Sequence, residues 1–149
     1  MATILITGGT GLVGSALIET LLKNVEYNII VLTRHVNAHL KNNKYGNRLR
    51  YMAWDVDRKI IDKEAIVQAD YIVHLAGAGV MDKKWTREYK DEIVESRVQS
   101  SKLLVKTLSE VSHNVKAFIS ASAIGWYGAD KPGQQEGFKE NVPNDKDFL

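Results

Sequence analysis

The sequence contains no cysteine among its 149 residues. Disulfides, thiolate metal sites and a cysteine nucleophile are therefore excluded. Proline is scarce as well, since Pro132 and Pro143 are the only two and both lie near the end of the sequence. No apolar run is long enough to cross a bilayer, and the first residues lack the basic leader of a secretion signal. These absences predict a soluble, cytoplasmic protein.

The composition is that of an ordinary globular protein. Charged residues make up 26% of the sequence and apolar residues 44%, which excludes a disordered or collagen-like chain. The length suits a single domain with a substantial core, so we expect one domain over residues 1–149. The formal net charge of +2 indicates no particular partner.

Short apolar, β-branched runs alternate with helical patterns along the chain. The expected strands are residues 3–7, 28–33, 49–54, 71–75 and 117–120. An amphipathic pattern follows the first strand at residues 12–21, and a longer apolar stripe runs from Ile93 to Leu108. This alternation predicts an α/β fold, a doubly wound parallel sheet with helices on both faces.

Two polar segments are expected to be surface loops, His39–Arg48 and everything after Tyr127. The second of these follows the last expected strand directly. A sheet that ends there, without further helices, would leave one face poorly covered. We therefore expect the chain to be the N-terminal part of a longer protein.

Glycines are concentrated in "TGGTGLVG", residues 7–14, where the first expected strand ends and the first expected helix begins. The spacing is G-x-x-G-x-x-G: Gly8 permits a tight turn, Gly11 lets the backbone approach a pyrophosphate, and Gly14 allows close packing of helix on strand. The helix N-terminus offers free N–H groups and a partial positive charge to phosphates. A glycine-rich turn without a ligand is the alternative, but the flanking strand and helix favour a Rossmann-type dinucleotide site.

The residues at the end of the second expected strand indicate which dinucleotide the site binds. NAD sites usually carry Asp or Glu there, whereas sites for the 2′-phosphate of NADP carry Arg. Here the strand ends in Thr33-Arg34, and between Glu26 and Asp55 there are basic residues but no acidic one. A guanidinium–phosphate pair contributes roughly 1.5–3 kcal/mol. We therefore predict NADP (NADPH) in preference to NAD.

Two alternatives to this interpretation of the basic residues stay open. Arg34 could be a solvated surface charge. The basic stretch could instead bind nucleic acid, although it has few aromatic side chains for stacking on bases. The basic residues concerned are Arg34, Lys41, Lys44, Arg48 and Arg50.

Several segments together resemble one protein family. They are "ILITGGTGLVGSAL", "VLTR", Trp54-Asp55, "HLAGAGV", residues 83–104 and "FISASAIGWYG", in this order through nearly the whole chain. They are similar to extended, atypical short-chain dehydrogenases/reductases of the NAD(P)-dependent epimerase/dehydratase type. Within that type, residues 85–86 and 96–98 resemble the subgroup known as epimerase family proteins or sugar nucleotide epimerases.

The resemblance adds residues to the expected cofactor site. It implies that Asp55 faces the adenine amine, with a strand-end cap as the alternative, and that small residues after the fourth strand lie against the ribose. Arg97 stands near a helix position where many relatives carry an asparagine, and an arginine paired with a neighbouring acid is the alternative. The full set of expected cofactor-binding residues is Thr7, Gly8, Thr10, Gly11, Leu12, Val13, Gly14, Arg34, Asp55, Leu75, Ala76 and Gly77.

The same resemblance supplies two catalytic candidates, Ser122 and Tyr127. Ser122 matches the family serine that hydrogen-bonds the substrate oxygen, with Ser120 as a rival and a small strand-end residue as the plain alternative. Tyr127 and Lys131 have the family's Tyr-x-x-x-Lys spacing, but the stretch is loop-like, so we expect the acid/base pair further downstream and Tyr127 beside the substrate.

These observations predict the NADP-binding domain of an oxidoreductase or epimerase-like enzyme. Hydride would move between the nicotinamide and a sugar-nucleotide-like or other small hydroxylated substrate, and this chain alone is expected to be inactive. A non-catalytic, NADP-responsive binding protein is the alternative. No metal site is expected, because the four histidines lack metal-ligand spacing. No nucleic acid or membrane partner is expected either, and a homo-oligomer stays open.

Overall fold

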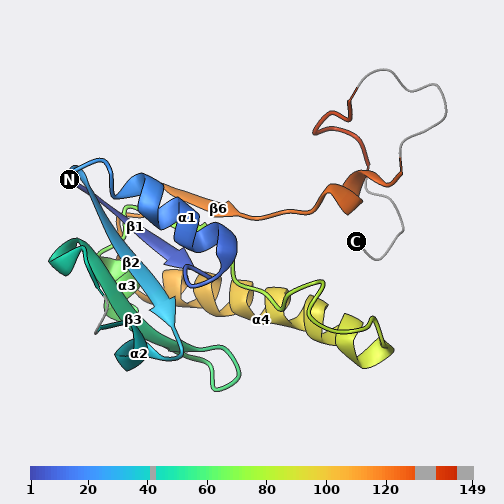
Figure 1. The fold of residues 1–149 in the computed structure, drawn as a ribbon, viewed down its shortest axis with the longest axis horizontal. Helices are drawn as coiled ribbons and strands as arrows, with labels where there is room; N and C mark the ends of the chain where they lie inside the picture. Colours follow the sequence, from blue (N-terminus) through green and yellow to red (C-terminus); the bar gives the residue numbers. More distant parts are fainter. Residues whose placement is uncertain (41–42, 130–136, 144–149) are drawn as a thin grey trace.

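The computed structural model describes residues 1–40, 43–129 and 137–143. A six-stranded sheet forms its centre, in the order β4-β3-β2-β1-β5-β6 (Figure 1). β3 and β4 pair antiparallel, and the other neighbours pair parallel. The strands are β1 (Ala2–Thr7), β2 (Tyr27–Thr33), β3 (Leu49–Asp55), β4 (Ile60–Ile61), β5 (Tyr71–His74) and β6 (Ala117–Ser120).

Helices cover both faces of the sheet, with α1 on one face and α3 and α4 on the other (Figure 1). The helices are α1 (Leu12–Leu21), α2 (Val36–Leu40), α3 (Lys63–Val67) and α4 (Arg87–Glu110), and the 3-10 turns are η1 (Gly46–Arg48) and η2 (Ile124–Tyr127). Within the described residues no helix has both the length and the apolar composition of a membrane span. The predicted doubly wound α/β fold is confirmed.

The core is divided between the two faces by the alternation of side chains along each strand. Leu5 pairs in register with Ile30 and Ile72, and all three pack towards α3 and α4. Ile4 pairs with Ile29, and both pack towards α1. Because helices cover both faces, both alternating sets are apolar, which explains why these strands are continuous hydrophobic runs.

Some elements differ from the sequence expectation. The expected strands are all present, with ends that shift by at most one residue. The antiparallel β4 and the helices α2 and α3 were not predicted, because elements of two and five residues are too short to show a period. The expected loop His39–Arg48 contains the end of α2 and the turn η1, while residues 41–42 lie outside the described part.

The strand order creates a crevice at one end of the sheet. From β1 the chain proceeds outward through β2 to β3, and then it returns to the other side of β1 to form β5 and β6. The connections after β1 and β5 therefore leave in opposite directions. Such a switch point, at the carboxyl ends of the strands, is where open α/β sheets bind ligands.

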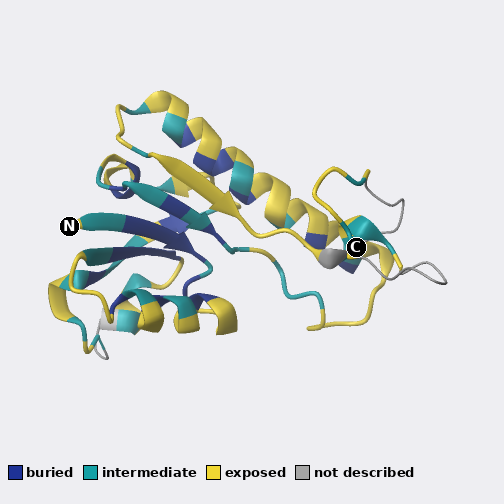
Figure 2. Ribbon diagram, turned by 90° about the horizontal axis from the view of Figure 1, so that it is seen from above, coloured by how far each residue is buried: buried dark blue, intermediate teal, exposed yellow. Residues whose placement is uncertain are grey.

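β6 is the least covered strand. All four of its residues are exposed, and Phe118 and Ile119 retain 37% and 56% of their accessible surface. After β6 the described chain leads away from the sheet (Figures 1 and 2). No α-helix follows β6 in residues 121–129 or 137–143, and for this reason the edge strand lacks a cover.

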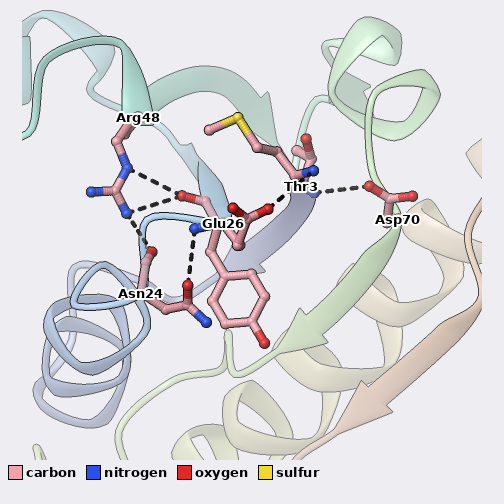
Figure 3. Close-up of polar contacts among 7 residues, drawn as sticks. Thr3, Asn24, Glu26, Arg48 and Asp70 are labelled. Atoms are coloured by element: carbon pink, nitrogen blue, oxygen red, sulfur yellow. Dashed lines mark hydrogen bonds and ion pairs between the residues drawn. The ribbon is translucent and has the colours of Figure 1, made fainter.

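Polar contacts join neighbouring elements at the opposite, amino-terminal end of the sheet (Figure 3). Thr3 N–H donates to the Asp70 carboxylate at 2.9 Å. Arg48 Nη2 donates to the carbonyl oxygens of Leu22, Asn24 and Tyr27 at 3.0, 2.6 and 3.2 Å. One guanidinium therefore joins η1 to the end of α1 and the start of β2, and at Leu22 it supplies a donor to a carbonyl group at the helix C-terminus.

Candidate functional site

A cleft of about 710 Å³ lies at the switch point. Its walls come from the turn after β1, the end of β2, the chain after β3, the chain after β5 and one face of α4. α4 extends beyond the carboxyl ends of the strands, so its first turns flank the cleft (Figure 1). The sequence-predicted residues that line it are Gly8, Thr10, Gly11, Arg34, Leu75, Ala76 and Gly77.

The glycine turn is packed directly against the end of β5. Gly8 has a φ of +69°, and a Cβ there would lie 2.8 Å from both atoms of the Leu75 carbonyl group. A Cβ on Gly14 would overlap the carbonyl oxygen of Gly8. Gly11, by contrast, faces the cleft. Glycine is therefore required at two of these positions by space alone, and at Gly8 also by backbone conformation.

The start of α1 opens on the cleft without a cap. Gly11 is the N-cap residue and supplies no side chain, and no acidic residue lies in the first turn. The first N–H groups of the helix and its partial positive charge are thus available to an anion. Leu12 and Val13 are 89% and 67% exposed and do not line the cleft, although both were predicted to contact the cofactor.

Arg34 lies in the wall formed by the end of β2, together with Thr33, His35 and His39. Thr33 Oγ1 accepts from His35 N–H at 3.2 Å, and the His39 ring stacks on Tyr51 at 4.9 Å. No acidic side chain of the described residues forms an ion pair with Arg34. Its guanidinium is exposed and free to bind an anion in the cleft.

The other described lysine and arginine residues between Glu26 and Asp55 do not line the cleft. Lys44 pairs with Glu19 at 3.3 Å, which raises the pKa of the Lys44 ammonium. Arg48 is held at the opposite end of the sheet, and Arg50 does not line the cleft. Lys41 lies outside the described residues. Arg34 is thus the member of this group that reaches the cleft.

Asp55 closes a turn at the end of β3. Its Oδ1 accepts from Arg58 N–H at 3.1 Å, and its Oδ2 lies 3.7 Å from Arg58 Nε. The next two residues, Val56 and Asp57, line the cleft, whereas Asp55 does not. The carboxylate therefore acts as the strand-end cap that was the alternative, and its contact with adenine stays a prediction.

The chain after β5 is held from two sides. On the β1 side, Thr7 Oγ1 accepts from the N–H groups of Leu75 and Ala76, both at 3.2 Å. On the α4 side, Ala78 N–H donates to Ser96 Oγ at 2.9 Å. The Tyr89 hydroxyl donates to the carbonyl of Gly79. This part of the cleft wall is therefore rigidly placed although it has no regular secondary structure.

Arg97 also forms hydrogen bonds that hold the chain after β5. Its Nη1 donates to the carbonyl oxygens of Ala78 and Ile93 at 3.1 and 2.9 Å. Its guanidinium carbon would be 2.9 Å from a Cβ on Gly77, so the arginine side chain would have to shift if that residue were larger. Arg97 forms no ion pair with a carboxylate of the described residues, contrary to the alternative considered from the sequence.

The catalytic candidates are not assembled at the cleft. Ser122 is exposed and, like Tyr127, absent from the cleft lining. η2 ends at Tyr127 because Gly128 adopts a φ of +73°, and the Tyr127 ring stacks on Phe138 at 5.3 Å. Lys131 lies outside the described residues. The catalytic roles of Ser122 and Tyr127 stay predictions.

His74 is the residue that the sequence analysis missed. It is 3% exposed and lies between Thr7 Oγ1, at 2.6 Å from its Nδ1, and Ser100 Oγ, at 3.2 Å from its Nε2. Burial lowers the pKa of its imidazole. A histidine within the apolar run of β5, beside Val73 and Leu75, was the available signal, because a buried polar side chain requires hydrogen-bond partners.

Comparison with known sequences agrees with this geometry. The family model described as "NAD dependent epimerase/dehydratase family" matches residues 4–146. An epimerase family protein of Staphylococcus haemolyticus is 37% identical over 129 residues, 85% of this chain and 39% of that protein. One from Staphylococcus aureus is 35% identical over 130 residues, 87% of this chain and 40% of that protein. The chain thus spans about two fifths of the length of these relatives.

Solved structures share the fold. UDP-glucuronic acid 4-epimerase from Bacillus cereus, in complex with UDP-glucuronic acid and NAD, has a TM-score of 0.72 at 20% identity, covering 95% of this chain and 45% of that one. UDP-glucose 4-epimerase from Bifidobacterium longum, in complex with NAD+ and UDP, has a TM-score of 0.72 at 23% identity, covering 97% of this chain and 43% of that one.

Proposed function

The chain belongs to the NAD dependent epimerase/dehydratase family, and from this premise we propose that its cleft binds a nicotinamide adenine dinucleotide across the switch point. The observation that carries the proposal is the contact between Gly8 and the Leu75 carbonyl, which leaves only main chain where β1 and β5 diverge. A diphosphate can approach main-chain amides at such a point without meeting a side chain.

The residues present suit the parts of such a cofactor. The Gly8–Gly11 turn and the uncapped start of α1 would hold the diphosphate. The ends of β2 and β3 would hold the adenosine half, and the chain after β5 would lie along the nicotinamide half. When bound, the cofactor supplies a hydride acceptor or donor.

We further propose that NADP is preferred over NAD. The support is Arg34, an exposed guanidinium in the cleft wall with no carboxylate partner in the described residues. The position usually taken by the acidic residue of an NAD site is occupied by this arginine. The B. cereus and B. longum epimerases were solved with NAD, so cofactor choice is a point on which this chain would differ from them.

Calorimetric titration with NADPH and NADH tests both proposals. We expect NADPH to bind about ten- to a hundredfold more tightly, because a guanidinium–phosphate pair adds roughly 1.5–3 kcal/mol. Arg34→Asp should reverse the order of the two affinities. Lys102→Glu, an exposed position on α4, is the control with the same change of charge and should leave both affinities unchanged. Equal affinities in the unaltered chain would refute the role of Arg34, and no binding of either would refute the dinucleotide site.

For the longer protein, we propose hydride transfer with a sugar-nucleotide-like or other small hydroxylated substrate, in which Ser122 holds the reacting oxygen. Family membership and the segment 118–128 support this. Ser122→Ala should lower kcat of the full-length enzyme about a hundredfold while leaving NADPH affinity unchanged. A change of less than about threefold would exclude the serine from the chemistry.

One observation favours a second function, a binding protein that responds to NADP without catalysis. Neither Ser122 nor Tyr127 lines the cleft, so neither of the two catalytic candidates contributes to its wall. The two functions are separated by incubating the protein with NADP and a panel of nucleotide sugars and following the absorbance of NADPH. Tight binding without turnover would favour the non-catalytic function.

A further inference from the structure

Three buried polar side chains, Thr7, His74 and Ser100, adjoin the cleft, and Ser100 is part of its lining. They are 0%, 3% and 1% exposed and come from β1, β5 and α4. Hydrogen bonds of 2.6 and 3.2 Å join them into one chain, with the His74 ring in the middle. We call these three side chains the histidine bridge. It connects the strand that leads into the glycine turn with the helix that flanks the other side of the cleft.

The hydrogen positions in the bridge follow from its Thr7 end. A threonine hydroxyl has two acceptor sites and one hydrogen to donate. The N–H groups of Leu75 and Ala76 both donate to Thr7 Oγ1, at 3.2 Å each, and occupy its acceptor sites; Leu75 N–H is shared with the main-chain carbonyl oxygen of Thr7, also at 3.2 Å. The remaining interaction of Thr7 Oγ1 is the 2.6 Å contact with His74 Nδ1. Thr7 must therefore donate its hydrogen, and Nδ1 must accept it.

The Ser100 end leads independently to the same conclusion. Ser100 Oγ lies 3.1 Å from the carbonyl oxygen of Arg97, which can only accept, so the serine hydrogen points there. The 3.2 Å contact between Ser100 Oγ and His74 Nε2 then requires the hydrogen on Nε2. Both ends thus place one hydrogen on Nε2 and none on Nδ1, which makes His74 a neutral imidazole with a single tautomer.

From this geometry we propose that His74 is a positioning residue of the cofactor cleft, acting through Thr7 and only as the neutral Nε2–H tautomer. The proposal rests on the proposed dinucleotide function of the cleft. With its hydrogen directed at Nδ1, Thr7 Oγ1 keeps both acceptor sites turned to Leu75 and Ala76. Those two amides fix the end of β5 against Gly8, which is the narrow point that the cofactor must cross.

Within the described part of the chain, the other groups in contact with the imidazole carry no charge. On the β6 side the Phe118 ring lies 6.0 Å away, and Ala121 N–H donates to the main-chain carbonyl of His74 at 3.1 Å. β1 contributes the Thr7 hydroxyl and α4 the Ser100 hydroxyl. An imidazolium would carry a second hydrogen, on Nδ1, and would force Thr7 to release one of the two amides.

Nitrogen-15 NMR of the full chain tests the tautomer directly. Long-range proton–nitrogen correlation spectra distinguish Nε2–H, Nδ1–H and doubly protonated rings, and comparison with His74→Gln assigns the signals of this ring. We expect the Nε2–H pattern at neutral pH. An Nδ1–H or doubly protonated pattern would overturn the proposal. This result does not depend on whether the cleft binds a dinucleotide.

Binding of NADPH by variants tests the positioning role. His74→Phe removes the two ring nitrogens that contact Thr7 and Ser100 and should weaken NADPH binding about tenfold or more. His74→Asn returns an acceptor oxygen close to the place of Nδ1 and should recover most of that loss. The matched control is His113→Phe, an exposed histidine after the end of α4, which should bind like the unaltered chain.

The outcomes separate this proposal from the one on which it rests. If the unaltered chain binds no dinucleotide, the proposed function fails while the NMR result still decides the protonation of the bridge. If His74→Phe is folded, as judged by thermal melting, and binds NADPH unchanged, the positioning role is refuted. If His74→Phe does not fold, His74→Asn decides, because weak binding by folded His74→Asn would contradict the role of the Thr7 contact.

Discussion

Residue types at the turn after β1 are determined by the space around them. Gly8 needs both a left-handed backbone and the absence of a side chain facing Leu75, and Gly14 packs against the Gly8 carbonyl. The sequence pattern predicted both requirements in general form. It could not predict that Asp55 would close a turn with Arg58, because a carboxylate at a strand end suits a cap and a ligand equally well.

Gly14→Ala measures the packing requirement. Helix propensity alone would make alanine about 1 kcal/mol better than glycine within α1. The new methyl group would instead overlap the Gly8 carbonyl, and overpacking of this kind costs about 1–3 kcal/mol. We therefore expect Gly14→Ala to lower the free energy of unfolding in urea and to abolish dinucleotide binding.

The control for this variant is Ser15→Ala, on the same helix but exposed. It removes only a hydrogen bond from Ser15 Oγ to the Leu12 carbonyl and should change stability by less than about 0.5 kcal/mol. Equal stability of Gly14→Ala and the unaltered chain would show that the turn can move away from the helix.

At the level of elements, length decided what could be predicted. α4 is long enough to show its helical period and the central strands are continuous apolar runs of strand length, and both were expected. α3 has five residues, and its start is marked by Asp62, whose side chain accepts from Glu64 N–H at 3.1 Å. That cap was visible in the sequence, but five residues show no clear helical period beside it.

The junction of α1, η1 and β2 depends on Arg48. Replacing it with glutamine removes donors from the carbonyls of Leu22, Asn24 and Tyr27. Because hydrogen bonds to a charged group contribute roughly 1.5–3 kcal/mol, Arg48→Gln should lower the free energy of unfolding by about 2 kcal/mol in a urea titration.

Lys23→Gln, an exposed change near the same helix end, serves as the comparison and should alter stability little. NADPH affinity should be the same in both variants, since Arg48 lies at the end of the sheet away from the cleft. A loss of affinity in Arg48→Gln alone would mean that Arg48 contributes to the cofactor site from the opposite end of the sheet.

For the whole molecule, the cleft is the place where all the layers meet. Its walls include residues from the β1, β2 and β5 ends and from α4, so a ligand there contacts elements on both sides of the sheet. A ligand that contacts all of these elements should therefore stabilise the fold as a unit. The molecule also leaves β6 exposed at one edge, and it spans about two fifths of the length of its curated relatives.

Thermal unfolding with added cofactor checks this expectation. NADPH at about 100 times its Kd should stabilise the protein by about 2.7 kcal/mol and raise Tm accordingly. NADH at the same concentration should raise Tm less, and Arg34→Asp should remove the advantage of NADPH. An equal rise with inorganic phosphate at that concentration would indicate anion binding in general and not a dinucleotide site.

The sequence by itself determined the layered fold, the location of the glycine turn and the family, because these depend on local backbone preferences and on side-chain periods within single elements. The tertiary structure alone decided which polar side chains meet. Thr7, His74 and Ser100 are 67 and 26 residues apart in successive steps, and Arg48 reaches back 26 residues to Leu22 at the end of α1. Such pairings arise only when separate elements pack together, and no local pattern encodes them.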